Sequence, residues 1–263
     1  MRNVLFIMGG GPRIAYGVGS AWALRRIGIE FEYVIGVSMG ALIGSFFLDD
    51  SLEKALEYLR YSHHKTKYLP LNASEMIDVL WGKKLISNHS NLRIVATTND
   101  GQPELLDSTR RAYLATMCIP GLTTNRATYI EGKTYRDGSF NPLPVEVIAK
   151  LCGFGTVFVL PNRPVITSAV PSLKELQWGL RAGIRLPLGL ILKALTKPLL
   201  FQKAVKSAPD LGLDVKIIWP EGPEIDAFEE DPEVLLDAAN TAARSTFKAF
   251  NQEPIVFPGL NSS

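Results

Sequence analysis

Hydrophobic positions along this chain follow two alternating patterns. Short apolar or β-branched runs predict strands, and between them apolar residues recur at the spacing of a helix face. Strands that alternate with helices favour crossover connections and a mostly parallel sheet covered on both faces, so we predict an α/β fold. The predicted strands are Val4–Met8, Phe31–Ile35, Arg93–Thr97, Thr156–Leu160 and Asp214–Trp219, and the predicted helices are Ala15–Arg26, Leu52–Tyr61, Val145–Leu151 and Pro232–Phe250.

Local signals refine this pattern at two places. Thr128–Asp137 contains Glu131-Gly132-Lys133 and is expected to form a hairpin. Asp231-Pro232 supplies a cap and a proline at the first helical position for the last helix. Since no repeat, low-complexity tract or flexible linker interrupts the pattern, we expect one domain over residues 1–263.

Composition allows a large core and gives no sign of export. The chain has 263 residues, of which 46% are hydrophobic. Its first apolar run is too short for a signal peptide, and no stretch is apolar for long enough to span a bilayer. Cys118 and Cys152 lack metal-type spacing and are expected to be reduced core thiols. We therefore expect a cytoplasmic protein.

Charge is unevenly distributed, although the net charge is only +2. Basic residues outnumber acidic ones mainly within residues 165–206. This range belongs to a variable, basic and apolar segment at residues 165–210. Pro187 and Pro198 are expected to break this segment into short helices. Two interpretations stay open: amphipathic helices that close over the core, or a lid whose lysines meet an anionic membrane surface at its periphery.

The stretch Gly36-Val37-Ser38-Met39-Gly40 joins a predicted strand to helix-forming residues. Gly-x-Ser-x-Gly in that context is typical of a nucleophile elbow, a strained turn that raises a serine hydroxyl above the sheet. Larger side chains two residues away on either side would collide, which explains Gly36 and Gly40. Ser38 is therefore predicted to be a nucleophile near the positive end of a helix.

A serine nucleophile needs a base, and the histidines do not supply the usual one. His63, His64 and His89 are the only histidines, and the α/β-hydrolase order places the histidine after both the serine and the acid. We therefore exclude a standard triad and expect all three histidines to be exposed on the surface.

Asp137 is the carboxylate that stands out as an alternative base. It ends a predicted strand, and Gly138 behind it permits a tight turn. Asp137 is either a simple turn residue or the base of a Ser–Asp dyad. The ordinary aspartate pKa of about 3.9 is too low for an efficient base near neutral pH, so a dyad requires burial that raises it.

The glycine cluster Gly9-Gly10-Gly11 follows the first predicted strand and allows two interpretations. Dinucleotide binding would use Gly9 and Gly11, with Glu30 or Glu32 on the ribose, but position 14 is Ile where that motif packs a glycine. The favoured interpretation is an oxyanion hole in which Gly10 and Gly11 donate their N–H groups. In that interpretation Gly9 makes the bend and Arg13 adds positive charge.

Together these motifs resemble the patatin-like phospholipases. FIMGGGPRIAYGVGSAWAL resembles the oxyanion segment and first helix of that family, IGVSMGALIGSFF its elbow, and IPGLTTNRATYIEGKTYRDGSFNPLPVEVIAK its acid-bearing segment. The closing DAFEEDPEVLLDAANTAARSTF is similar to its last helix. The resemblance covers essentially the whole chain, most loosely at about 165–210.

The resemblance implies a three-layer α/β/α fold and hydrolysis of acyl esters, often of lipids, through an acyl-serine and without metal or cofactor. By motif position it implies a dyad of Ser38 and Asp137, with Gly9, Gly10, Gly11 and Arg13 in the oxyanion motif. Ile14 departs from the family pattern, because a glycine usually follows the basic residue. Such a side chain is expected to shift the first helix outward or to narrow the acyl pocket.

The expected function is therefore a serine acyl hydrolase that acts on a lipid or a small acyl ester, with no nucleic-acid partner. Two alternatives stay open. An acyltransferase would use the same dyad and pass the acyl group to an alcohol. A non-hydrolytic module with a disabled site would only bind a lipid or a nucleotide.

Overall fold

The computed structural model describes residues 2–55, 72–119, 123, 127–164, 188–226, 229 and 231–257. Its sheet has the strand order β5-β6-β3-β2-β1-β7-β8, and β4 pairs with β3. Along the part β3-β2-β1-β7-β8 of this order, neighbouring strands are parallel. β4 and β6 run antiparallel to β3. The strands are β1 (Arg2–Ile7), β2 (Tyr33–Val37), β3 (Leu92–Thr98), β4 (Pro103–Asp107), β5 (Thr128–Ile130), β6 (Lys133–Asp137), β7 (Gly155–Leu160) and β8 (Leu213–Ile217).

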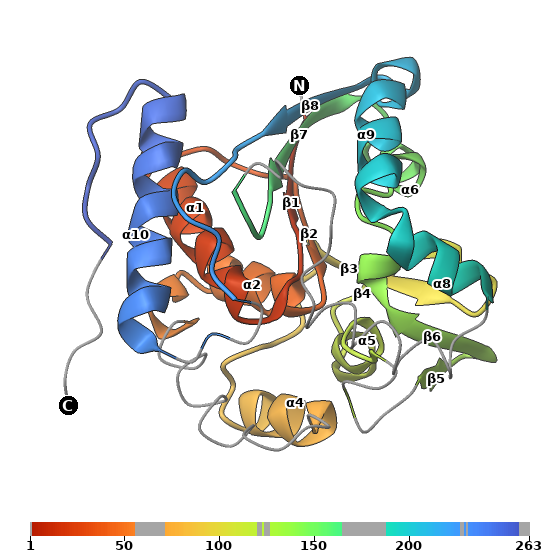
Figure 1. Ribbon diagram of the computed structural model, residues 1–263. Coiled ribbons are helices and arrows are strands. Elements are labelled where there is room, and N and C mark those ends of the chain that lie inside the picture. Colours follow the sequence, from red (N-terminus) through yellow and green to blue (C-terminus); the bar gives the residue numbers. More distant parts are fainter. Residues whose placement is uncertain are drawn as a thin grey trace.

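Helices cover both faces of this sheet (Figure 1). One face carries α1 (Ile14–Ile27), α2 (Met39–Leu48) and α10 (Pro232–Ala249), and the other carries α6 (Val145–Cys152) and α9 (Lys197–Ser207). Successive β1 residues point to opposite faces, because side chains alternate along a strand. Leu5 and Ile7 pack into the core under α1, and Val4 and Phe6 into the core under α6. The predicted α/β/α layering around a mostly parallel sheet is confirmed.

The predicted elements are found with shifts of one or two residues at their ends. The hairpin is also confirmed, with Glu131 (φ 46°) and Gly132 (φ 84°) in its turn. Asp231 caps α10 as expected, since its side chain accepts a hydrogen bond from the Glu233 N–H at 2.9 Å. The predicted helix Leu52–Tyr61 is helical at residues 52–55 and otherwise lies outside the described residues.

Three elements were missing from the sequence-based prediction: β4, α4 (Ala73–Gly82) and α5 (Arg110–Thr116). β4 is a half-exposed edge strand that begins with a proline, so it lacks the continuous apolar run of the central strands. α4 and α5 each begin at a capping side chain. The Asn72 side chain accepts a hydrogen bond from the Glu75 N–H, and the Thr109 side chain accepts one from the Ala112 N–H.

Within the described residues the basic segment forms two short helices that meet next to Pro198, whereas Pro187 lies outside them. α8 (Leu188–Leu195) begins directly after Pro187, and α9 has Pro198 in its first turn. Residues 165–187 lie outside the described part. No helix in the described part of the chain combines the length and the apolar character needed to cross a membrane.

His89 corrects one expectation. Its side chain is only 17% exposed, and Nε2 lies 3.3 Å from Asp49 Oδ2 and 3.1 Å from Ser87 Oγ. The loop before β3 packs against the end of α2, so this histidine is partly buried and paired. His63 and His64 lie outside the described residues. Cys118 and Cys152 are free and buried, as predicted.

Candidate active site

Ser38 occupies a strained turn between β2 and α2. Its backbone has φ 52° and ψ −127°, a conformation that non-glycine residues rarely adopt. A Cβ at Gly36 would collide with the Ala41 backbone, and one at Gly40 with the carbonyl oxygen of Ile7. The predicted strand-to-helix elbow is therefore present, and Ser38 lies at the amino end of α2.

Thr116 of α5 holds the Ser38 backbone in place. The Ser38 N–H donates to Thr116 Oγ1 at 2.8 Å, and the Thr116 hydroxyl donates to the Val95 carbonyl oxygen at 2.5 Å. Sequence reasoning missed this residue, because no motif or spacing relates Thr116 to a serine 78 positions earlier.

The register of β3 brings Ser38 and Asp137 together. Val95 pairs with Val37 of β2, and the next residue, Ala96, pairs with Asp137 of β6. Since β4 occupies the other edge of β3 at both positions, β2 and β6 lie end to end along one edge. Ser38 follows Val37 directly, so the predicted nucleophile and the predicted base meet where the two strands end.

The Asp137 side chain is completely buried. Oδ1 accepts a hydrogen bond from the Ser139 N–H at 2.7 Å, and the Asp137 N–H donates to the Cys118 carbonyl oxygen at 3.0 Å. A Cβ at Gly138 would overlap with the Val95 carbonyl oxygen, which explains the glycine after the acid. Burial raises the pKa of Asp137 above its ordinary value, the direction that a base needs.

The second carboxylate oxygen of Asp137 has no partner of ordinary hydrogen-bond geometry among the described residues. The Ser38 hydroxyl nevertheless lies close enough to lower the pKa of Asp137, as do Ser139 and Lys197, against the larger effect of burial. The two groups are thus neighbours whose hydrogen bond is not fully formed. Catalytic hydrogen bonds are often long without substrate and tighten when it binds.

The glycine turn before α1 packs directly against Ser38. A Cβ on Gly9 would lie 2.6 Å from Ser38 Cβ and 2.6 Å from the Val37 carbonyl oxygen. Gly10 and Gly11 are partly exposed, and their amides donate to no other described residue. Gly11 has φ 59°, which a residue with a side chain rarely adopts. Two N–H groups with no partner in the described part of the chain therefore lie in the turn that touches the serine.

A family model for patatin-like phospholipase matches residues 5–149. The chain belongs to the patatin-like phospholipase family. The matched range runs from β1 to α6 and includes the elbow, the acid turn and the glycine cluster. This membership places the chain among the lipid acyl hydrolases in general. No curated protein matches the chain significantly.

Arg13 connects the patatin-like glycine turn to a distant loop. Its guanidinium is largely buried, with Nε donating to the Ile225 carbonyl oxygen at 3.0 Å and Nη2 lying 3.0 Å from Glu224 Oε1. Tyr16 extends this contact by donating to the Pro223 carbonyl oxygen. These contacts give Arg13 an anchoring role in addition to the predicted electrostatic one.

Ile14 is fully buried where the family pattern has a glycine. It belongs to the core cluster under α1, and its side chain lies beside Gly17. The extra side chain therefore fills core space at the start of α1.

Two lysines from α8 and α9 reach over the acid turn, beyond the matched patatin-like range. Lys193 donates to the Gly101 carbonyl oxygen and, at 2.8 Å, to Asn141 Oδ1. Lys197 donates to Ser139 Oγ at 3.2 Å, two residues from Asp137. In the sequence alone, both lysines are recognisable only as members of a basic segment.

Two open hollows of the described surface lie away from this patatin-like site. One of about 470 Å³ runs along α9, and one of about 260 Å³ lies between α1 and the residues that follow α2. Neither is lined by Ser38, which is only 6% exposed, or by Asp137. Burial of this degree keeps bulk water away from both side chains, which favours a raised pKa of the Asp137 carboxyl group.

Proposed function

We propose that the protein is a serine acyl-ester hydrolase that acts on lipid esters through a dyad of Ser38 and Asp137. The observation that carries the proposal is the end-to-end arrangement of β2 and β6 along β3. This arrangement puts Asp137 next to the end of β2, where Ser38 follows Val37. Burial of Asp137 and the strained elbow at Ser38 support the same assignment.

In the proposed cycle, Ser38 Oγ attacks the ester carbonyl carbon while Asp137 accepts the hydroxyl proton. The Gly10 and Gly11 N–H groups hold the oxyanion of the tetrahedral intermediate, and loss of one such donor typically costs about 3 kcal/mol. The carbon–oxygen bond to the leaving alcohol then breaks, and the alcohol takes the proton from Asp137. Water repeats the sequence on the acyl-enzyme and releases the acid.

The deciding experiment is labelling with a fluorophosphonate probe combined with turnover of a short-chain aryl ester. Ser38→Ala is expected to abolish labelling, because the nucleophile is removed. Asp137→Asn is expected to lower kcat by roughly 10² to 10⁴-fold, the usual contribution of a general base. Both variants should give the same circular dichroism spectrum as the wild type.

The same assay separates the alternatives. A wild type that is not labelled would favour a binding module with a disabled site. Nearly normal activity of Asp137→Asn would show that Asp137 is a simple turn residue and not the base. Product analysis with an added alcohol distinguishes hydrolysis, which yields free acid, from acyl transfer, which yields a new ester.

A further inference from the structure

The outward side of α8 and α9 exposes a row of leucines. Leu192, Leu195 and Leu199 are 55%, 65% and 65% exposed. The two helices meet at Thr196, whose N–H donates to the Leu192 carbonyl oxygen and whose carbonyl oxygen accepts from the Leu200 N–H. Leu192 and Leu195 are three residues apart in α8 and so share one face of that helix, and Leu199 follows in the first turn of α9.

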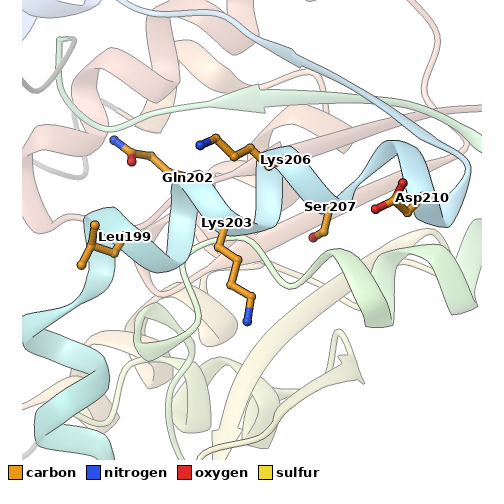
Figure 2. A pocket seen from close by; sticks show the side chains of 6 residues that line it. All are labelled: Leu199, Gln202, Lys203, Lys206, Ser207 and Asp210. Atoms are coloured by element: carbon orange, nitrogen blue, oxygen red, sulfur yellow. The ribbon is translucent and has the colours of Figure 1, made fainter.

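The same spacing continues along α9 with polar residues. Gln202, Lys203 and Lys206 are the next exposed positions, and together with Leu199 they line the hollow of about 470 Å³. Figure 2 shows these side chains on α9, with Ser207 and Asp210 near its end. An apolar row therefore passes into a polar, mainly basic one along the same surface.

The charged side chains of α8 and α9 are all positive. Residues 188–207 contain four lysines and no acidic residue, and Asp210 is the only acid that lines the hollow. Lys193 and Lys197 turn inward to Asn141 and Ser139, whereas Lys203 and Lys206 are exposed. Leucines beside outward lysines are the composition of a helix that lies in a membrane interface.

We propose that the α8–α9 face, formed by Leu192, Leu195, Leu199, Lys203 and Lys206, docks the protein on a lipid bilayer that carries anionic head groups. The leucines would enter the acyl-chain boundary, and the lysines would meet the head groups. The inference rests on the proposed function for the choice of a lipid surface. Its link to the site is Lys197, which is on the same helix and bonds to the turn of Asp137.

The test is co-sedimentation of the full chain with phosphatidylcholine vesicles, with and without about a third of phosphatidylglycerol. Wild type is expected to bind the anionic vesicles more strongly. The double variant Lys203→Gln, Lys206→Gln should lower the partition coefficient for anionic vesicles by about fivefold per lysine. Its binding to neutral vesicles should equal that of the wild type. Leu195→Ala with Leu199→Ala should lower binding to both, by roughly tenfold per leucine.

Matched controls are Lys54→Gln and Val256→Ala, which change an exposed lysine and a 74% exposed valine elsewhere on the surface. Both should bind as wild type does. Ser38→Ala should also bind normally, and all face variants should hydrolyse a water-soluble short-chain ester at the wild-type rate. Failure of docking is thereby distinguished from failure of the proposed catalysis.

Three results would overturn the inference. The first is a wild type that binds neither kind of vesicle. The second is a set of face variants that bind as strongly as the wild type. A wild-type dimer that the leucine substitutions convert to a monomer, without vesicle binding, would assign this face to a second copy of the chain instead.

Discussion

Asp137 is held where its negative charge receives incomplete compensation. Its carboxylate has one oxygen bonded to the Ser139 N–H and one without a hydrogen-bond partner of ordinary geometry among the described residues. A buried polar atom left in this way costs stability. Ser38 adds a backbone conformation that is costly for a residue with a side chain. Both residues thus store free energy at the position proposed for catalysis.

Asp137→Asn is therefore expected to raise the thermal unfolding midpoint at pH 7 while it removes activity. Burial raises the pKa of Asp137 in the folded state. Between the ordinary pKa and the raised one, the folded state holds a proton that the unfolded state has lost, so stability falls as pH rises through that window. The gain in the variant should accordingly disappear in acid below the ordinary pKa.

Calorimetry across pH measures this difference, with Asp210→Asn as the control because Asp210 is exposed. A surface substitution of that kind changes stability by about 0.5 kcal/mol or less. A variant at Asp137 that unfolds earlier than wild type at pH 7 would contradict the prediction.

At the scale of elements, α1 is held against α10 by an unusually close backbone approach. A Cβ added at Gly19 would overlap with the carbonyl oxygen of Ala239. α10 presents small buried residues along this contact, including Ala238, Ala242 and Ala243. Since α1 begins directly after the glycine turn, this contact also supports the loop that touches Ser38.

Gly19→Ala is expected to destabilise the protein by about 1 to 3 kcal/mol, because backbone rather than a flexible side chain would have to move. Gly82→Ala is the matched control: it also lies in a helix, but a Cβ there would meet nothing within 4 Å. That change should be neutral or stabilising by up to about 1 kcal/mol, since alanine favours a helix. Urea unfolding of both variants measures the contrast, and equal effects would contradict it.

At the scale of the whole molecule, α8 and α9 contact the turn that follows Asp137, although they lie far from it in the sequence. Lys197 reaches Ser139 across 58 positions, and Lys193 reaches Asn141 across 52. Asn141 in turn donates to Thr97 Oγ1 of β3 at 3.0 Å. α8 and α9 are thereby connected to β3, the strand that pairs with both β2 and β6.

Lys197→Met is expected to move the acidic limb of the pH profile for kcat/KM to higher pH. Lys197 lowers the pKa of Asp137 against the effect of burial, so its loss lets that pKa rise further. The other titratable groups nearby are Arg136, adjacent in the chain, and Cys118, whose thiol stays neutral because burial raises its pKa. A short-chain ester assay from acid to neutral pH measures the shift.

Two variants separate charge from packing in this experiment. Lys197→Arg should restore the wild-type profile, because it keeps the positive charge. Lys203→Met, on the exposed side of the same helix, should leave the profile unchanged. A profile of Lys197→Met that matches wild type would show that Lys197 only packs against the turn.

Much of the fold was predictable from local pattern. β1 is apolar at residues 4–7 and β7 at residues 157–160, all of them buried, and α10 has a cap and a proline at its start. β4 was not predictable, because a proline-led edge strand is specified by its pairing with β3 and not by its own sequence. His89 was placed wrongly because the packing of its loop on α2 is a tertiary contact.

The sequence alone determined the elbow at Ser38, the glycine turn, the Asp-Gly turn and the absence of a histidine in triad order, because each depends on residue type and short spacing. Only the tertiary structure decided that β2 and β6 meet on β3, that Thr116 holds the Ser38 amide and that lysines of α8 and α9 reach the acid turn. These contacts join residues far apart in the chain, and their register follows from how the sheet and its covering helices pack together.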